Sequence, residues 1–417
     1  MTPGPATGGS GATGGAGAAR HAGPDTGSAA AAGAKAAARR SVEERRSDLV
    51  ALSRALHDDP ELCFEEFHAA ERLGDALEAA GFTVRRGAYD LPTAVEARVG
   101  SGPLSVVICA EYDALPGVGH ACGHNLIAAA AVGGGAALAG LADDLGLTVT
   151  VLGTPAEEGG GGKVLLLERG AFTGAHAAMM VHPWPEDRLV ATCLAVDHVE
   201  VRYTGRAAHA SASPEQGVNA ADAIVVAQVA IGLLRQHLRH GDQVHGIVTK
   251  GGDAANVVPA ETTGRFMVRA GTLEDLAVLR PRIERCFEAG ALATGSTLEI
   301  RDLSPTYSHF VADDALMSSW RRNAGELGRH YPRDDDGEPP PTISTDMANV
   351  SLAVPSIHPM IGVESHGAVN HQAEFAEACV GPSAEQALFD GALGMAWTAI
   401  DAATDASLRT HLLAGTA

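Results

Sequence analysis

The chain has 417 residues, of which 46 % are hydrophobic and 19 % are charged, and its 30 Lys and Arg against 51 Asp and Glu give a formal net charge of −21. This composition can bury a sizeable core in two or three domains, and six cysteines spread over such a length do not suggest a disulfide framework. The acidic balance argues against nucleic-acid and anionic-membrane partners, because both require clustered basic residues.

Residues 1–40 consist mostly of Gly, Ala, Ser, Thr and Pro. Such a segment lacks the apolar residues that offset chain entropy, so we expect a disordered tail. It also lacks the charged start and apolar stretch of a secretory signal, which favours a cytoplasmic location. Order is expected from Ser41, because Ser41 and Glu44 fit a capping box at a helix start.

Residues 41–192 show the pattern of an α/β domain. A continuous apolar run at 104–110 predicts a central buried strand. Further strands are expected at 83–86, 94–99, 147–152 and 177–181, and helices at 65–80 and 126–141. Strands that alternate with helices predict a largely parallel core, which continues in residues 305–417 with a strand at 356–363 and a helix at 383–402.

Residues 193–304 have a different character, because apolar and polar residues alternate from Val199 to Tyr203. The expected order is strand, helix, strand, strand, helix, strand, which is typical of a ferredoxin-like insert. Pro281 should kink the second of these helices. A polar, Pro-rich loop is expected at 333–341.

Five short segments carry potential catalytic chemistry, and each begins where a predicted strand ends or a loop begins. They are EYDALP (111–116), GHACGHN (119–125), TPAEEGGGG (154–162), VHPWP (181–185) and NHQAEF (370–375). Each segment alone is a weak signal, since a lone Cys or His is more often a buried core residue. Ligands bind outside the carboxyl ends of strands in open α/β sheets, so the five together favour one shared metal site.

Together these segments resemble the metallopeptidase family of aminoacylase and bacterial glutamate carboxypeptidase, in the amidohydrolase branch of auxin-conjugate and p-aminobenzoyl-glutamate hydrolases. EYDALPGVGHACGHN (111–125) and STDMANVSLAVPSIHP (344–359) are most similar to the β-alanyl-lysine dipeptidase sub-branch. The resemblance covers about residues 42 to 405. It implies a mixed sheet with flanking helices and an inserted α+β lid and dimerisation domain, and therefore a homodimer.

The resemblance also implies roles for single residues. The metal ligands would be Cys122, His124, Glu158, His182 and His371. Glu157 would be the general base, Asp113 would support the metal site, and His209 and Asn256 of the insert would contact the substrate. Two positions depart from the branch: Asn125 stands where much of it has Asp, and Glu111 stands where the wider family has a His ligand.

The chemistry of the residues supports the same mechanism. Two divalent ions can lower the pKa of a water and polarise a carbonyl, and a carboxylate such as Glu157 can move the proton. Thiolate and imidazole ligands favour Zn, while Mn or Co is also compatible. Weaker candidates are His358 and Asp346 for substrate binding, His120 and His366 near the site, and Arg265 and Arg269 for a substrate carboxylate.

These observations predict a metal-dependent enzyme that hydrolyses the amide bond of small dipeptides or N-acyl amino acids. An aroyl-amino-acid hydrolase of the p-aminobenzoyl-glutamate type is the alternative. A non-catalytic binding protein on the same fold is a third possibility, but such a protein should have lost Glu157 or a ligand, and all are present.

Overall fold

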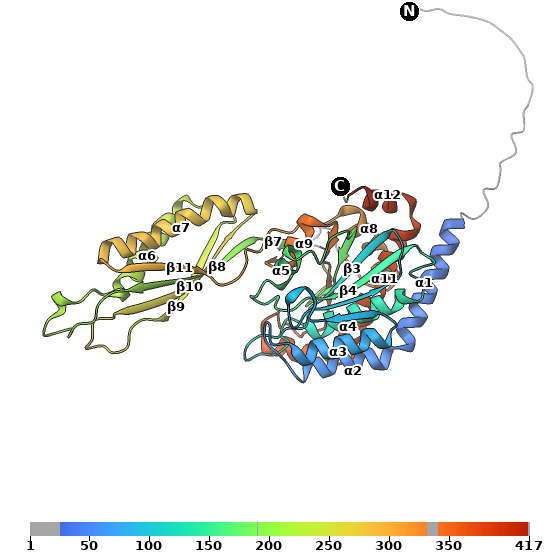
Figure 1. Cartoon of the computed structure of the whole chain (residues 1–417), viewed down its shortest axis with the longest axis horizontal. Coiled ribbons are helices and arrows are strands. Elements are labelled where there is room, and N and C mark those ends of the chain that lie inside the picture. The colour runs from blue at the N-terminus through green and yellow to red at the C-terminus, as the bar shows by residue number, and fades with distance from the viewer. Residues whose placement is uncertain (1–25, 190, 332–340, 416–417) are drawn as a thin grey trace, which may run out of the picture.

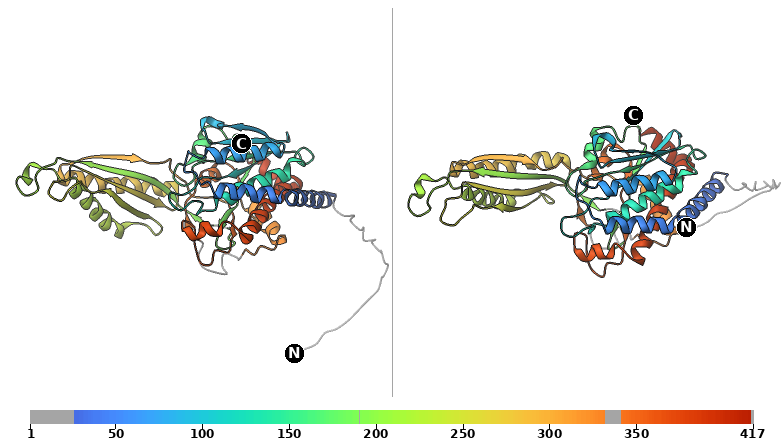
Figure 2. Two further views of the ribbon diagram at one scale, coloured as in Figure 1. Left: turned by 90° about the horizontal axis from the view of Figure 1, so that it is seen from below. Right: turned by 60° about the horizontal axis from the view of Figure 1, so that its bottom comes forward.

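The computed structural model describes residues 26–189, 191–331 and 341–415 (Figure 1). They form a larger domain, built from chain segments on both sides of an insertion, and an inserted lobe. Figures 1 and 2 show the lobe extending from one side of the larger domain. No helix in these described ranges is long and apolar enough to cross a membrane.

The larger domain is built on a six-stranded sheet with the order β1-β2-β4-β3-β5-β13. Its strands are β1 (Thr83–Arg86), β2 (Val95–Val99), β3 (Leu104–Ala110), β4 (Leu147–Gly153), β5 (Ala177–Met179) and β13 (Ser356–Ile357). The last four run parallel, whereas β2 is antiparallel to β4 and β1 is antiparallel to β2. The carboxyl ends of four strands therefore share one edge.

Helices cover both faces of this sheet, because β3 is apolar on both sides. Val106 and Ile108 face a core shared with α4 (His124–Ala139) and α11 (Pro382–Thr404). Val107 and Cys109 face a second core with α5 (Gly162–Glu168) and α9 (Met347–Ala353). The first core also receives side chains from α2 (Arg46–His57), α3 (Phe67–Ala79), α8 (Asp314–Glu326), α10 (Ala373–Ala378) and α12 (Ala406–Ala414). The predicted mixed sheet with flanking helices is confirmed.

The inserted lobe is an antiparallel sheet with two helices on one face. Its strands are β8 (Ala195–Thr204), β9 (Gln243–Lys250), β10 (Glu261–Ala270) and β11 (Thr297–Asp302), in the order β11-β8-β10-β9. The helices α6 (Ala220–Leu234) and α7 (Leu273–Thr294) follow β8 and β10, and they bury Val199, Val201 and Tyr203 of β8 in a core of their own. The order of elements is the one expected for a ferredoxin-like insert.

The expected disordered tail is wrong for residues 26–40, since helix α1 spans Thr26–Glu44. Ser41 lies inside this helix and does not cap a new one. Alanine has the highest helix propensity, and α1 packs against α11, where Trp397 donates a hydrogen bond to the Lys35 carbonyl at 3.0 Å and Lys35 forms a 2.7 Å ion pair with Asp401. Residues 1–25 lie outside the described residues.

Three smaller differences concern element boundaries. Helix α7 runs through Pro281 as one element, although a kink was expected there. The strand expected at 356–363 is divided into β13 and β14 (Met360–Gly362), and β14 pairs with β6 (His182–Trp184). Residues 333–340 of the expected polar loop lie outside the described part of the chain.

Candidate metal centre

The carboxyl ends of the parallel strands bring the predicted site residues together. Glu111 and Asp113 follow β3, the pair Glu157 and Glu158 follows β4, His182 follows β5, and His358 follows β13. Cys122 and His124 lie at the start of α4, and His371 lies in the loop before α10. Residues from five distant segments thus meet at the edge of one sheet.

The side-chain atoms of the five predicted ligands face one another. Cys122 Sγ lies 3.6 Å from His182 Nε2 and 3.7 Å from His371 Nε2. His371 Nε2 lies 3.6 Å from Glu158 Oε2. Two groups of three ligand atoms lie within 4.8 Å of one another, and Cys122 belongs to both. They are Cys122, His124 and His182, and Cys122, Glu158 and His371.

These distances fit divalent metal ions. Two ligand atoms on one tetrahedral Zn lie about 3.4 Å apart when both are N or O, and about 3.6 Å apart when one is S. Buried polar atoms are normally hydrogen-bonded, yet His124 Nε2 and Glu158 Oε1 have no such partner within the described residues. An ion bound between these atoms would satisfy both of them.

Hydrogen bonds fix the orientation of the two buried histidines. His124 Nδ1 lies 2.8 Å from the Asp113 carbonyl oxygen and 3.1 Å from Asp113 Oδ1. His182 Nδ1 donates to the Pro183 carbonyl at 2.8 Å. Both Nε2 atoms are therefore left facing the cluster, which is the usual arrangement of metal-binding histidines. Asp113 Oδ2 also accepts from the Glu158 backbone N–H at 2.9 Å, so Asp113 supports two candidate ligands.

The electrostatic surroundings of the cluster disfavour its chemistry unless a cation is present. Burial and the charge of Glu158 raise the pKa of the Cys122 thiol. Burial lowers the pKa of His182 to about 4, so its imidazole is neutral and free to bind metal. Burial, with the charges of Glu111 and Glu158, raises the pKa of Glu157. A thiolate next to several carboxylates requires compensating positive charge.

His371 is held in an unusual conformation. Its φ is 73°, a value that non-glycine residues rarely adopt, and its backbone N–H donates to the Ala121 carbonyl at 2.9 Å. Its side chain is 60 % exposed, in contrast to the buried side chains of the other ligands. Strained backbone of this kind is concentrated at functional sites.

Three other candidates lie outside the cluster. Asn125 donates to Ser53 Oγ at 2.9 Å and to the Cys379 carbonyl at 3.0 Å, and it makes no contact with the ligand atoms. His120 is buried and stacks on His57. His366 is 83 % exposed and lines a separate surface hollow.

Asp346 was predicted to bind substrate, but the structure differs. It is fully buried, and its two oxygens accept hydrogen bonds from Lys163, at 2.7 Å from Nζ and 2.8 Å from the backbone N–H. Lys163 was missed at the sequence level. The available signal was a lone charge in the apolar segment GKVLLLE, directly after the glycine run of TPAEEGGGG.

A cavity of about 370 Å³ opens onto the cluster. Glu157 lines it, as do His358 from the larger domain and Arg269 from β10 of the lobe. Arg269 Nη1 donates to Ser344 Oγ at 2.7 Å, while its buried Nε has no hydrogen-bond partner in the described ranges. His358 packs edge-on against His182, with 5.4 Å between ring centroids.

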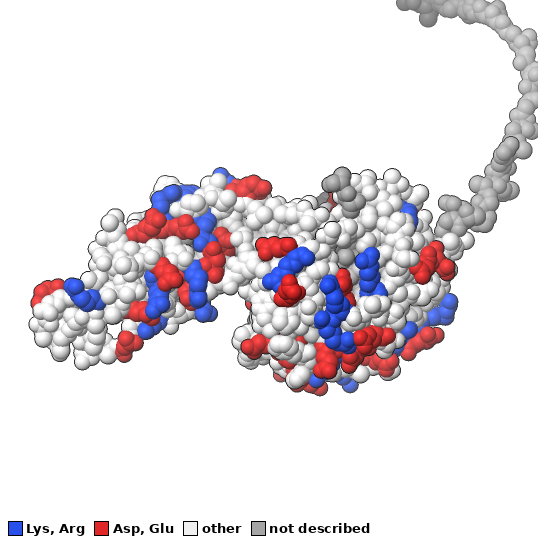
Figure 3. Space-filling model, viewed as in Figure 1, with Lys and Arg blue, Asp and Glu red and all other residues white. Residues whose placement is uncertain are grey.

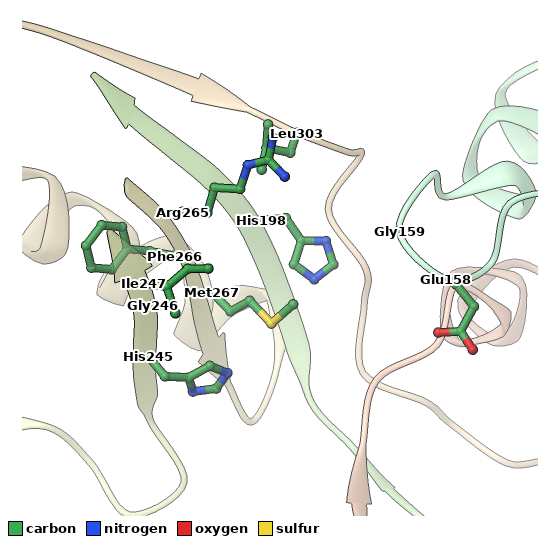
Figure 4. Close-up of a pocket in the computed structure, with 10 residues that line it drawn as sticks. All are labelled: Glu158, Gly159, His198, His245, Gly246, Ile247, Arg265, Phe266, Met267 and Leu303. Carbon is green, nitrogen blue, oxygen red and sulfur yellow. The ribbon is translucent and has the colours of Figure 1, made fainter. Parts of the chain in front are cut away.

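A second cavity of about 680 Å³ lies between Glu158 and the open face of the lobe sheet, where His198 and His245 face it (Figure 4). Arg265 also lines this cavity but is already paired. Its Nε lies 3.2 Å from Glu200, which binds Arg301 as well. Figure 3 shows basic and acidic side chains interspersed in this way over the lobe. Of the two arginines on β10, Arg269 therefore lies at the candidate site.

His209 and Asn256 are not brought to the metal cluster of their own chain. Both are exposed and lie in loops beyond the end of β8, where the Ala210 N–H donates to the Asn256 carbonyl at 3.0 Å. The near end of β8 is tied to the larger domain, since Val196 and Tyr307 exchange backbone hydrogen bonds. The strand from Val196 to Thr204 spans roughly 26 Å at about 3.3 Å per residue. These two residues can therefore reach a metal cluster only in another chain, or after a large movement.

A cluster of thiolate, imidazole and carboxylate ligands, with an unbound carboxylate beside it and a cavity in front, defines a metal-dependent hydrolase. Residues 107–386 match the model of peptidase family M20/M25/M40. The mouse and human Xaa-Arg dipeptidases are each 39 % identical, over 375 and 379 residues, with 86 % of both chains covered. One of the polypeptides of Escherichia coli p-aminobenzoyl-glutamate hydrolase is 34 % identical over 282 residues, which cover 63 % of this chain and 59 % of that protein.

Solved structures have the same fold. An aminohydrolase from methicillin-resistant Staphylococcus aureus superposes with a TM-score of 0.70 at 20 % identity, covering 88 % of this chain and 99 % of that one. A Bacillus subtilis protein described as a dinuclear metal-binding peptidase of the M20 family gives 0.64 at 22 % identity, with 86 % and 98 % covered.

The chain belongs to peptidase family M20/M25/M40. It is a metal-dependent hydrolase of the amide bond in small dipeptides or N-acyl amino acids, and its cofactors are divalent metal ions.

Proposed function

We propose that this chain hydrolyses dipeptides with a basic C-terminal residue, at two divalent ions held by Cys122, His124, Glu158, His182 and His371. The substrate assignment rests on the 39 % identity to mammalian Xaa-Arg dipeptidases over 86 % of the chain. Zn is the first choice of metal, because thiolate and imidazole ligands favour it, and Mn or Co can replace it.

Bound metal would supply Lewis acidity for the scissile carbonyl and a water of lowered pKa. Glu157 accepts the proton of the attacking water and donates it to the leaving amine. Its raised pKa suits both steps, because a group that exchanges a proton works best with a pKa near the working pH. Tyr307 holds the Glu157 backbone in place, since its hydroxyl donates to the Glu157 carbonyl at 2.7 Å and accepts from the Gly161 N–H at 2.9 Å.

The cavity suits a dipeptide that carries a free carboxylate. Arg269 lies across the 370 Å³ cavity from the ligands and has an unpartnered, buried Nε–H, so it binds the substrate carboxylate. His358 faces the same space with an Nε2 atom that has no hydrogen-bond partner among the described residues, and it contacts the substrate near the scissile bond.

The working form is a homodimer joined through the lobe. Helix α6 exposes an apolar stripe at helical spacing, with Val225 55 %, Val229 59 % and Leu233 72 % exposed, and the edge strand β9 exposes Ile247. In a dimer, His209 of one chain donates a hydrogen bond to the oxyanion in the partner's site, and Asn256 contacts the same substrate. The cytoplasmic location remains a prediction from the sequence.

A substrate panel with Zn, Mn or Co added to metal-free protein tests the proposal. Alanyl-arginine and β-alanyl-lysine are compared with alanyl-glutamate, N-acetyl-arginine and p-aminobenzoyl-glutamate. We expect the highest kcat/KM for dipeptides that end in Arg or Lys. A higher value for p-aminobenzoyl-glutamate would establish the alternative activity, which the 34 % identity to the Escherichia coli hydrolase favours. Metal binding with no hydrolysis of any compound would indicate a non-catalytic binding protein.

A further inference from the structure

Lys163 forms a buried charge network beside the metal cluster. Its side chain is fully buried, and its Nζ lies 2.5 Å from Glu111 Oε1 and 2.7 Å from Asp346 Oδ1. The two carboxylates are equally buried. A buried ammonium is tolerated only when it is paired, and here one ammonium meets two carboxylates, so the network has one excess negative charge.

That excess charge is directed at the candidate ligands. Glu111 Oε1 is occupied by Lys163, whereas Glu111 Oε2 is buried without a hydrogen-bond partner in the described part of the chain. This free oxygen lies 3.4 Å from His124 Nε2, which also lacks a partner. Glu111, His124 and Glu157 form a third group whose ligand atoms lie within 4.8 Å of one another.

The distance between the two unpartnered atoms matches shared coordination. An O and an N atom, each about 2.0–2.1 Å from one tetrahedral ion, lie about 3.4 Å apart. The charges agree as well. The site buries five carboxylates and one ammonium, a net charge of −4 when all are ionised, which two divalent cations would balance. The carboxylates are Glu111, Asp113, Glu157, Glu158 and Asp346.

We propose that Glu111 is a further metal ligand, binding through Oε2 the ion held by His124, and that Lys163 positions it. This inference rests on the proposed metal centre. Because Lys163 holds Oε1, Glu111 can offer only one oxygen to the ion. Asp346 fixes Lys163 from the opposite side and is a positioning residue, which explains its complete burial.

Cobalt titration of metal-free protein tests this role without any substrate. Co²⁺ absorbs in the visible range according to the number and type of its ligands, so the spectrum reports coordination directly. The variants are Glu111→Gln, which keeps an acceptor for Lys163, and Lys163→Met, which removes the ammonium at similar size. Glu66→Gln is the matched control, because Glu66 is also fully buried with one unpartnered oxygen, but it belongs to none of the three ligand groups.

We expect Glu111→Gln to weaken the binding of one of two Co²⁺ ions by at least 10- to 100-fold and to change its visible spectrum. Lys163→Met should lower the affinity by about 10- to 100-fold, the usual effect of losing an outer partner of a ligand. Glu66→Gln should match the wild type. If Lys163→Met does not fold, Glu111→Gln alone decides the matter.

Wild-type affinity and spectrum in Glu111→Gln would overturn the inference and leave the proposed function standing. A wild-type protein that binds no Co²⁺ would refute both. Equal losses in Glu111→Gln and Glu66→Gln would mean that any buried carboxylate near the site has this effect, and would also overturn the role of Glu111.

Discussion

Replacing Arg269 by methionine tests how the site selects its substrates. The substitution removes the guanidinium that faces the ligands across the cavity but keeps a long apolar side chain. Ser344 loses the hydrogen bond from Arg269 but still donates to the Leu194 carbonyl at 2.9 Å, so no buried hydroxyl is left without a partner. The expected loss is therefore confined to the substrate carboxylate.

A hydrogen bond between charged groups contributes about 1.5–3 kcal/mol, which corresponds to about 10- to 150-fold in kcat/KM. The assay compares alanyl-arginine with its C-terminal amide, which has no carboxylate. Arg269→Met should reduce kcat/KM for the acid by this factor and leave the amide almost unaffected. Arg265→Met is the control, because Arg265 lies on the same strand and is already paired with Glu200. Equal losses for acid and amide would refute a contact between Arg269 and the carboxylate.

Three further predictions concern the proposed machinery. Glu157→Gln should retain metal and lose about 10²- to 10⁴-fold in kcat, the usual contribution of general acid–base catalysis, and more than half of wild-type turnover would exclude Glu157 as the base. Cys122→Ala and His371→Ala should each lose metal by elemental analysis, while the exposed His366→Ala keeps it; the reverse pattern would reassign the C-terminal ligand. His209→Ala should lose about 10²- to 10³-fold in kcat with metal content unchanged, and mixing it with Glu157→Gln should restore activity if His209 acts in the partner's site. No recovery, despite subunit exchange shown by native mass spectrometry, would contradict that role.

Much of the cluster could be predicted because parallel strands place their carboxyl ends at one edge. The apolar runs at 104–110 and 147–152 mark β3 and β4, and the polar segments that follow them had to meet. Topology thus determines which segments meet, even where their separation in sequence is large. His371 is the clearest case, since it joins Cys122 across 249 positions.

Other features depend on packing that local patterns do not reveal. The Ala-rich segment before Ser41 has the composition of a disordered tail, and it is helical because α11 provides a surface for it. Lys163 follows a glycine run in a short helix, and only the tertiary structure shows that Glu111 and Asp346 surround it. The same holds for Asp346, whose position in STDM suggested a surface role although it is fully buried.

The two sets of candidate residues depend on different levels of structure. The metal cluster is assembled within one chain from strands of a single sheet, so it requires no partner. His209 and Asn256 lie beyond the far end of β8, roughly 26 Å along the strand from its contact with Tyr307, and a rigid four-stranded sheet cannot fold them back. The exposed stripe on α6 belongs to the same lobe, so association through it would carry both residues toward a second chain. If the protein were monomeric in solution, the role of His209 would fail first, while the metal cluster and Glu157 would be unaffected.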